Sequence, residues 1–189
     1  MLSPRVVAGA PRFGPPPLIL ALGGQRSGKS AWAERRLLAT GLAPVYVATA
    51  EAWDAEMRAR IAHHRARRGD GWRLVEAPLE LAGAVGEAST PERAVLVDCL
   101  TLWLTNLMVA ERDPALAADE LEAALAARRG PVVLVSNEVG SGVVPTNAMA
   151  RRFVDEAGRL HQRLARGATE VVLVTAGLVQ TLKPDPGDG

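Results

Sequence analysis

The stretch GGQRSGKS, residues 23–30, decides how the rest of this sequence is interpreted. Its spacing of Gly23, four residues, and then Gly28, Lys29 and Ser30 fits the phosphate-binding pattern G-x-x-x-x-G-K-[ST]. Glycines allow a tight turn whose backbone N–H groups point at phosphate oxygens. In this pattern the lysine reaches the β- and γ-phosphates, and the hydroxyl completes a Mg²⁺ shell. The stretch therefore predicts binding of a nucleoside triphosphate with Mg²⁺.

The flanking sequence favours this interpretation over a glycine-rich turn with an incidental lysine. The apolar run at 18–22 is typical of a buried strand, and residues 29–40 have the pattern of a helix. A helix that begins at the end of the loop turns its unpaired N–H groups toward the anion. The order strand, loop and helix is the context that a phosphate-binding loop requires.

Length and composition favour one globular domain. The chain has 189 residues, of which 48% are hydrophobic, and this suits a single α/β domain with a full core. The 22 Lys and Arg residues nearly balance the 21 Asp and Glu residues, so the net charge of +1 gives no general argument for a nucleic-acid or membrane partner. Cys99 is the only cysteine, which excludes an internal disulfide and fits a reducing cytoplasm.

The expected organisation is a leader, one domain and a tail. Residues 1–17 contain five prolines and no apolar run of the kind found in signal peptides, so we expect a Pro-rich leader there. The catalytic domain is expected over 18–183, and a short tail over 184–189. The longest apolar stretch, CLTLWLTNLMVA at 99–110, is too short to span a bilayer and predicts a buried helix.

Strand-like runs alternate with helix-like segments along the chain. One predicted helix begins at Asp113, with Pro114 in the first helical position. Near-continuous Val/Leu strands that alternate with helices are typical of a parallel sheet covered on both faces. We therefore predict an α/β fold with a mostly parallel sheet flanked by helices. The predicted strands are residues 18–22, 44–49, 72–77, 94–99, 131–137 and 170–177.

Polar residues at the ends of these strands are candidate ligand contacts, because such sheets bind ligands beyond the carboxyl ends of their strands. Asp98 follows four apolar residues, an arrangement that places a carboxylate beside the Mg²⁺ of the loop. Alternatively, Asp98 caps the following helix. Glu76 either accepts hydrogen bonds from a ribose or is a solvated loop acid. Thr49 ends its strand in the same layer.

A long polar stretch, SNEVGSGVVP at 136–145, follows the fifth predicted strand. Loops of this length between compact elements are usually functional or mobile. Asn137 and Glu138 are the polar groups closest to the end of the strand. Glu138 and Asp98 are both candidates for the general base that would activate an acceptor hydroxyl.

The segment WDAEMRARIAHHRARRGDGW, residues 53–72, predicts a basic helix with two adjacent histidines. Helical spacing puts His64 on one face with Met57 and Ile61, and His63 on another. Nearby arginines oppose protonation of either imidazole, and a neutral imidazole beside bound phosphates is a competent nucleophile. The alternative is a solvated, arginine-rich surface helix with no catalytic role.

The third histidine, His161, falls on a separate amphipathic helix, so the histidines are not expected to form a metal cluster. Four apolar residues of that helix recur at helical spacing and are predicted to face the core rather than a ligand. They are Met149, Phe153, Leu160 and Leu164.

Taken in order, these motifs resemble the bifunctional adenosylcobinamide kinase / adenosylcobinamide-phosphate guanylyltransferase family of cobalamin biosynthesis. The resemblance extends from about residue 18 to 183. Its histidine-containing helix and its N-E-V-G-x-G-x-V-P stretch are not general features of phosphate-binding loops. The motifs that carry it are GGQRSGKS, YVATAEA, DAEMRARIAHHRARR, VEAP, VDCLTLWLTNL and SNEVGSGVVPTNAMARRFVDEAGRLHQRLA.

The resemblance implies two reactions. In the first, ATP or GTP phosphorylates the aminopropanol hydroxyl of adenosylcobinamide. In the second, GTP transfers GMP to that phosphate, releases pyrophosphate and gives adenosylcobinamide-GDP. The family passes GMP through a phosphoramidate on the histidine of an R-I-x-x-H-R pattern, which maps here to Arg60, Ile61, His64 and Arg65. The resemblance thus selects His64 over His63.

The resemblance also implies a RecA-like P-loop fold and a homotrimer with active sites near subunit boundaries. Combined with the motif analysis, it gives His64, Lys29 and Asp98 as catalytic residues and Ser30 and Asp98 as Mg²⁺ ligands. The implied nucleotide contacts are Gly23, Gly24, Gln25, Arg26, Ser27, Gly28, Lys29, Ser30, Val47, Ala48, Thr49, Arg65, Ala66, Arg67, Arg68, Glu76 and Asp98.

Two alternatives stay open at this point. The chain is a plain small-molecule kinase whose histidine helix acts only as a clamp, or it is a nucleotide-dependent switch or assembly module that binds nucleic acid through the arginines of 58–68. The near-neutral net charge and the lack of aromatic residues among those arginines argue against nucleic acid. We therefore expect a cytoplasmic enzyme with a corrinoid substrate and without a nucleic-acid partner.

Overall fold

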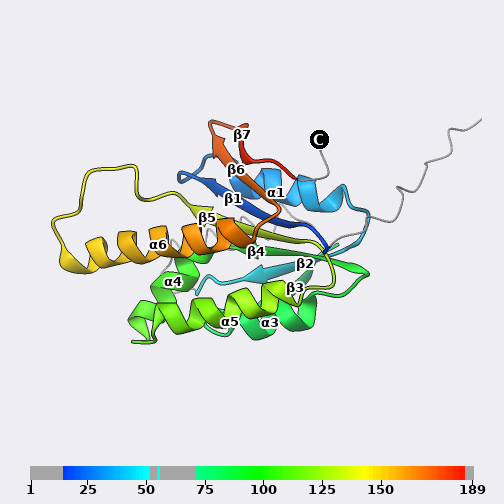
Figure 1. The fold of residues 1–189 in the computed structure, drawn as a ribbon, viewed down its shortest axis with the longest axis horizontal. Helices are drawn as coiled ribbons and strands as arrows, with labels where there is room; N and C mark the ends of the chain where they lie inside the picture. The colour runs from blue at the N-terminus through cyan, green and yellow to red at the C-terminus, as the bar shows by residue number, and fades with distance from the viewer. Residues whose placement is uncertain (1–14, 52–54, 56–70, 186–189) are drawn as a thin grey trace, which may run out of the picture.

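A seven-stranded sheet forms the centre of the protein (Figure 1). The computed structural model describes residues 15–51, 55 and 71–185. The strand order is β3-β2-β4-β5-β1-β6-β7; the first six strands in this order pair in parallel, and β7 is antiparallel to β6. This confirms the predicted mostly parallel sheet. The strands are β1 (Leu18–Gly23), β2 (Ala43–Ala48), β3 (Arg73–Glu76), β4 (Arg93–Asp98), β5 (Val132–Asn137), β6 (Glu170–Thr175) and β7 (Leu178–Lys183).

Helices cover both faces of this sheet. Helix α1 packs on one face, and α3, α4, α5 and α6 lie on the other (Figure 1). Along β1, Ile19 belongs to the core cluster under α1, whereas Leu20 belongs to the cluster that includes Trp103 of α4. Burial on both faces explains why the strands are continuous apolar runs. The helices are α1 (Lys29–Leu38), α3 (Leu81–Ala88), α4 (Leu100–Val109), α5 (Pro114–Ala126) and α6 (Ala148–Gly167).

The predicted helix starts are confirmed where the structure describes them. Helix α5 begins with Pro114, and the Asp113 side chain accepts a hydrogen bond from the Ala115 N–H at 2.8 Å. The long apolar stretch forms the buried helix α4, in which Trp103 is 1% exposed and donates its indole N–H to the Leu79 carbonyl at 2.9 Å. This indole hydrogen bond anchors α4 to the segment before α3.

The C-terminal end of the sheet differs from the prediction. The sixth strand was expected to continue to residue 177, but β6 ends at Thr175. Ala176 and Gly177 have φ angles of 53° and 79° and form a two-residue turn into β7, which the sequence analysis missed. Such turns need positive φ at both central residues, and only Gly177 signals this in the sequence, because alanine rarely adopts it.

Helix α6 is amphipathic, but only two of the four side chains predicted to face the core are buried. Leu160 and Leu164 are 5% and 2% exposed, as predicted. Phe153 is half-buried, and the prediction for Met149 is wrong, since this side chain is 66% exposed. The reason is visible in Figure 1, where the first turns of α6 extend beyond the carboxyl ends of the strands. Side chains on these turns therefore have no strand to pack against.

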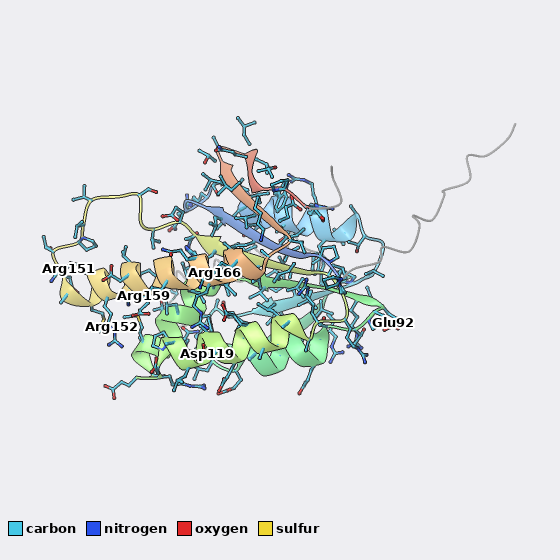
Figure 2. All side chains as sticks on the ribbon, viewed as in Figure 1. Glu92, Asp119, Arg151, Arg152, Arg159 and Arg166 are labelled. Carbon is cyan, nitrogen blue, oxygen red and sulfur yellow. The ribbon has the colours of Figure 1, made fainter. Side chains whose placement is uncertain are left out.

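Charged residues occupy the outer face of α6. Figure 2 shows Arg151, Arg152, Arg159 and Arg166 spaced along this helix. Arg163 donates to Asp119 at 2.5 Å and to Glu122 at 2.6 Å, and these carboxylates raise the pKa of the guanidinium above its usual value. The resulting ion pairs link α6 to α5 across the helical layer.

The segment that leads into β5 packs closely, at Gly130, against the backbone at the start of β4. A Cβ atom at Gly130 would lie 2.3 Å from the carbonyl oxygens of both Arg93 and Thr90. We expect Gly130→Ala to lower the free energy of unfolding by roughly 1–3 kcal/mol, because these backbone atoms must shift. The measurement is urea unfolding.

Gly86 is the matched control for Gly130, because it lies in α3 and a Cβ atom added there would meet nothing within 4 Å. We expect Gly86→Ala to stabilise the protein by roughly 0.5–1 kcal/mol through helix propensity and a restricted unfolded state. Equal stability changes in the two variants would contradict the close approach.

Candidate functional site

The phosphate-binding loop, residues 23–30, follows β1 at the carboxyl edge of the sheet and leads directly into α1. Gly23 is required by close approach, since a Cβ there would lie 2.4 Å from the Val174 carbonyl oxygen of β6. Gly28 has a φ of 96°, in the left-handed region, and precedes the first residue of α1. Lys29 is 7% exposed and donates to the Gly24 carbonyl at 3.0 Å.

Ser27 is buried beneath the exposed part of this loop. Its carbonyl accepts from the Gly177 N–H at 2.8 Å, so the β6–β7 turn supports the loop. The Ser27 Oγ is buried and, among the described residues, has no hydrogen-bond partner. A buried hydroxyl without a partner costs free energy, and a phosphate oxygen would satisfy it. The loop therefore suits an anionic ligand with several oxygen atoms.

Asp98 lies at the end of β4, separated from the phosphate-binding loop by one strand. It pairs with Val135 of β5, which pairs with Ala21 of β1. The Tyr46 hydroxyl donates to Asp98 Oδ2 at 3.0 Å, which orients the carboxylate. The alternative that Asp98 caps α4 is wrong, because the capping position is Cys99 and its side chain makes no capping hydrogen bond.

The carboxyl ends of β4, β2 and β3 lie side by side in the sheet, with Asp98 at the end of β4. Ala48 of β2 pairs with Asp98 on one side and with Glu76 of β3 on the other, so the two carboxylates flank β2 at the same level. Glu76 is exposed. Thr49 is buried and exchanges two hydrogen bonds with the Cys99 backbone, at 2.8 and 2.9 Å, which hold the segment after Asp98. Val47, the other predicted contact on β2, is buried in the core.

Asn106 is a site-supporting residue that the sequence analysis did not single out. Its Nδ2 donates to the carbonyls of Thr49 at 2.8 Å and Pro78 at 2.9 Å, and the side chain is 4% exposed. It therefore ties the ends of β2 and β3 to α4. Its signal in the sequence was an amide in the middle of an otherwise apolar helix.

The end of β5 joins the phosphate-binding loop to the long loop at 138–147. Asn137 pairs with Gly23 across the sheet and donates to Thr101 Oγ1 at 3.1 Å. The Glu138 N–H donates to the Gly23 carbonyl at 3.0 Å. Asn137 thus connects the start of the phosphate-binding loop with α4, and Glu138 lies directly beside that loop.

A buried histidine, His161, lies close to the Glu138 carboxylate. His161 of α6 is 8% exposed, and its Nε2 lies 2.7 Å from Ser136 Oγ. Its Nδ1 lies 3.9 Å from Glu138 Oε2, while Glu138 Oε1 accepts from the Gly140 N–H at 2.6 Å. Burial lowers the pKa of His161 below its usual value of 6.5, and the Glu138 carboxylate opposes this shift. The imidazole is therefore neutral at pH 7 and holds Ser136 as a hydrogen-bonding partner.

The remaining predicted site residues lie outside the described part of the chain. These are His63 and His64, the predicted contacts Arg65, Ala66, Arg67 and Arg68, and the basic segment around them. The described residues bring together the phosphate-binding loop, Asp98, the ends of β2 and β3, and the start of the 138–147 loop along one edge of the sheet (Figure 1). Gly24, Gln25 and Arg26 form the exposed crest of the phosphate-binding loop.

The described residues contain neither a metal-binding group of side chains nor a membrane-spanning helix. Among them, no group of three or more His, Cys, Asp and Glu side chains could hold a metal ion by itself. This does not bear on Mg²⁺ held with a nucleotide, which needs only one or two protein ligands beside the phosphates. No helix in the part of the chain described here is long and apolar enough to cross a membrane.

Comparison with known proteins identifies the family. Residues 19–182 match the CobU family model, described as cobinamide kinase / cobinamide phosphate guanyltransferase. The chain belongs to this family. It is 51% identical over 170 residues to the bifunctional adenosylcobalamin biosynthesis protein CobP of Pseudomonas aeruginosa, with 88% of this chain and 98% of that protein covered. It is 44% identical over 183 residues to CobU of Salmonella typhimurium, with 88% and 99% covered. The resemblance drawn from the motifs is thereby confirmed.

Similar solved structures confirm the fold. The flagellar accessory protein FlaH of Methanocaldococcus jannaschii superposes with a TM-score of 0.51 at 13% identity, covering 93% of this chain and 83% of FlaH. The Pyrococcus horikoshii protein PH0250 gives a TM-score of 0.54 at 10% identity, covering 91% and 88%. At such identities the likeness concerns the fold alone. The shared fold is a mostly parallel sheet, in which β5 lies between the phosphate-loop strand β1 and the Asp98 strand β4.

The buried imidazole of His161 makes stability depend on pH. As the pH falls through 6.5 the unfolded chain takes up a proton on this histidine, whereas the folded protein, in which its pKa is lowered, takes it up only at lower pH. The unfolded state then binds more protons, so the free energy of unfolding falls as the pH falls from 6.5 to the folded pKa. We expect His161→Gln to lose less stability than wild type between about pH 7.5 and about pH 5.5.

The check is urea unfolding of both proteins across this pH range, with Ser136→Ala as the control. Ser136→Ala removes the hydrogen-bond partner but keeps the titrating ring, so its stability should still fall with decreasing pH. Parallel stability curves for wild type and His161→Gln would show that another group causes the pH dependence.

Proposed function

We propose that this enzyme phosphorylates adenosylcobinamide and then transfers GMP from GTP to adenosylcobinamide phosphate, through a guanylyl-histidine on His64. The family assignment gives the two activities, and the phosphate-binding loop carries the nucleotide part of the proposal. The observation that supports it most is the loop of 23–30, in which Lys29 donates to the Gly24 carbonyl and the buried Ser27 hydroxyl has no hydrogen-bond partner among the described residues. The role of His64 rests on the R-I-x-x-H-R pattern.

In this proposal the loop and the neighbouring strand ends hold the triphosphate. Backbone N–H groups of 23–30 and the start of α1 bind phosphate oxygens, and Lys29 leaves the Gly24 carbonyl for the phosphates. Ser30 and Asp98 would hold Mg²⁺, which neutralises charge on the phosphates during transfer. The donor set suits this ion, because a carboxylate that accepts from Tyr46 through Oδ2 still has a second oxygen.

The acceptor hydroxyl needs a base, and Glu138 is the better candidate of the two that the sequence offered. Asp98 is assigned to the metal and is bonded to Tyr46. Glu138 is bonded through its N–H to Gly23 and has a side chain 30% exposed, so its carboxylate is both near the loop and accessible. In the proposed kinase step Glu138 accepts the hydroxyl proton as the hydroxyl oxygen attacks the γ-phosphorus; the bond from that phosphorus to the β–γ bridging oxygen breaks, and the nucleoside diphosphate leaves.

We also include a homotrimer and a cytoplasmic location in the proposal. The exposed strand β7 supports a subunit contact, because Leu178, Val179 and Leu182 are 77%, 42% and 51% exposed on it. Apolar side chains on an edge strand favour pairing with another chain. The single buried cysteine, Cys99, suits a reducing compartment.

The transferase step is tested by incubating the protein with α-labelled GTP and Mg²⁺ without corrinoid. A guanylyl-histidine gives an acid-labile, base-stable protein label, and we expect it on wild type and on His63→Ala but not on His64→Ala. Label that survives in His64→Ala and is lost in His63→Ala moves the nucleophile by one residue. Absence of label from all three proteins favours the plain kinase.

The kinase step is tested with Glu138→Gln, which keeps the shape of the side chain and removes the base. We expect kcat for phosphorylation of adenosylcobinamide to fall by about 10²–10⁴-fold, while protein labelling by GTP stays within a few-fold of wild type. Ser141→Ala serves as the control, since the Ser141 hydroxyl lies 3.5 Å from the same carboxylate. Equal loss of both activities in Glu138→Gln indicates instead that Glu138 only supports the loop.

A further inference from the structure

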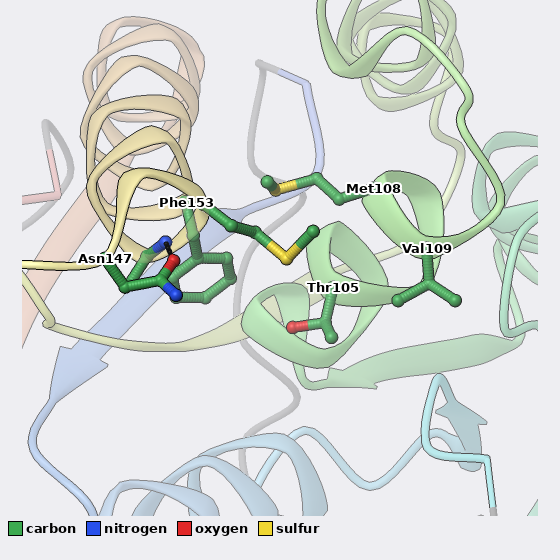
Figure 3. A pocket seen from close by; sticks show the side chains of 7 residues that line it. Thr105, Met108, Val109, Asn147 and Phe153 are labelled. Atoms are coloured by element: carbon green, nitrogen blue, oxygen red, sulfur yellow. Dashed lines mark hydrogen bonds between the residues drawn. The ribbon is translucent and has the colours of Figure 1, made fainter.

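Two helices leave an apolar hollow beside the carboxyl edge of the sheet. The hollow has a volume of about 320 Å³ and is lined by Thr105, Met108 and Val109 of α4 and by Asn147, Met149 and Phe153 at the start of α6. Figure 3 shows side chains from both helices converging on it. Val109 and Met149 are 61% and 66% exposed, although they are apolar. Exposed apolar side chains gathered in a concavity mark a binding site.

We propose that this hollow seats one edge of the corrin ring of adenosylcobinamide; the proposal rests on the function proposed above. A corrin ring is a large macrocycle with apolar, methyl-bearing faces and amide side chains around its rim. Methionine and phenylalanine side chains adapt to such a surface, because the thioether is flexible and polarisable and the aromatic ring adds contact area. The hollow is smaller than the macrocycle, so it holds an edge and leaves the rest over the neighbouring loop.

The rim of the hollow offers polar groups that match peripheral amides. Asn147 caps α6 by accepting from the Ala150 N–H at 3.1 Å through Oδ1, and its amide nitrogen is the donor end of the side chain. The Thr105 hydroxyl donates to the Thr101 carbonyl at 2.9 Å, and its oxygen remains an acceptor for an amide N–H. An apolar floor with one donor and one acceptor at its edge suits a ring with amide substituents.

The position of the hollow fits the reach of the substrate. The reacting hydroxyl lies on a flexible aminopropanol arm, so the ring must sit beside the nucleotide site and on the same edge of the sheet. Helix α4 starts directly after Asp98 and Cys99, and its rise puts Thr105 and Val109 roughly 8 and 14 Å beyond Leu100 along the axis. The ring would thus lie close enough for the aminopropanol arm to reach the site of phosphoryl transfer.

The 138–147 loop makes a second connection between the two sites. It begins at Glu138, whose N–H donates to Gly23 of the phosphate-binding loop, and it ends at Asn147 in the hollow. Along the way it exposes Val143 and Val144, at 96% and 73%. Figure 1 shows this yellow loop running outward from β5 to the first turn of α6. Its exposed valines extend the apolar surface available to a large flat ligand.

A second subunit is the other occupant to consider. The edge strand β7 already presents Leu178 and Leu182 for such a contact, and an edge strand pairs readily with another chain. The hollow is concave and has a polar rim beside the nucleotide site, which fits a small-molecule ligand better. Corrinoid binding and the size of the assembly, measured on the same variants, separate the two occupants.

The test uses the full-length protein with Met149→Lys and Val109→Lys. Leu116→Lys is the matched control, because Leu116 is 62% exposed on α5 and does not line the hollow. We expect both hollow variants to weaken adenosylcobinamide binding in equilibrium dialysis by about tenfold or more, from lost apolar contact and a buried charge. The KM for adenosylcobinamide should rise in parallel, and Leu116→Lys should match wild type.

Two further measurements make the outcomes separable. Labelling by α-labelled GTP without corrinoid reports the proposed histidine step, and sedimentation velocity reports the oligomeric state; we expect both to be unchanged in the hollow variants. Wild-type-like corrinoid binding in both variants overturns the proposal, and so does a smaller assembly, which assigns the hollow to a subunit interface. If wild type binds corrinoid through the hollow but takes no label, the histidine step fails and the corrin site stands.

Discussion

The parallel pairing of β4, β5 and β1 places the phosphate-binding loop, Asp98 and Glu138 relative to one another. Because β5 is inserted between the other two strands, Asp98 stands two strands away from the phosphate-binding loop, at a lateral distance of roughly 10 Å. In the proposed function this gap holds phosphates with a bound cation, and the end of β5 supplies Asn137 and Glu138 in the middle of it. On the other side of β1, β6 lies so close that a Cβ at position 23 would be 2.4 Å from the Val174 carbonyl oxygen, so only glycine fits there. The two neighbours of β1 therefore have different effects: β6 restricts the start of the loop, and β5 sets its distance from Asp98.

Much of the fold could be predicted from the sequence, because strands buried on both faces leave a strong apolar signal. Strands β1 to β5 were predicted to within one residue at each end, and Pro114 marked the start of α5. The nucleotide half of the site was predictable for a similar reason, since phosphate binding needs glycines, a lysine and a hydroxyl at fixed spacing within one short segment. Asp98 was singled out because it ends an apolar run, and it does end β4; its role stays a prediction. The histidine helix is the part for which the prediction rests on the sequence and the family alone.

The features that the sequence did not reveal depend on contacts between distant segments. Strand β7 is mostly exposed, so it lacks the apolar signal of the other strands, and its turn uses an alanine at positive φ. Met149 has the helical spacing of a core residue, but the sheet ends before α6 begins, and spacing cannot show where a sheet ends. The pairing of His161 with Ser136 brings together residues 25 positions apart through the packing of α6 on the sheet. Each of these needed the tertiary arrangement.

The two halves of the site are built by different physical means, and this bears on how they are used. The nucleotide half consists of backbone groups fixed by the sheet, since phosphates of any nucleotide present the same oxygens and reward rigid donors. The proposed acceptor half, between α4 and α6, consists of the exposed side chains of Val109 and Met149, the half-buried Phe153 and the 138–147 loop. Such flexible side chains can adapt to a large, irregular molecule, while the separate backbone groups of the loop still recognise the phosphates. Glu138 belongs to both halves, because its N–H is bonded to Gly23 and its side chain starts the loop that leads to the hollow. In the proposed function, a ligand that contacts this loop therefore lies next to the carboxylate proposed to receive the acceptor proton.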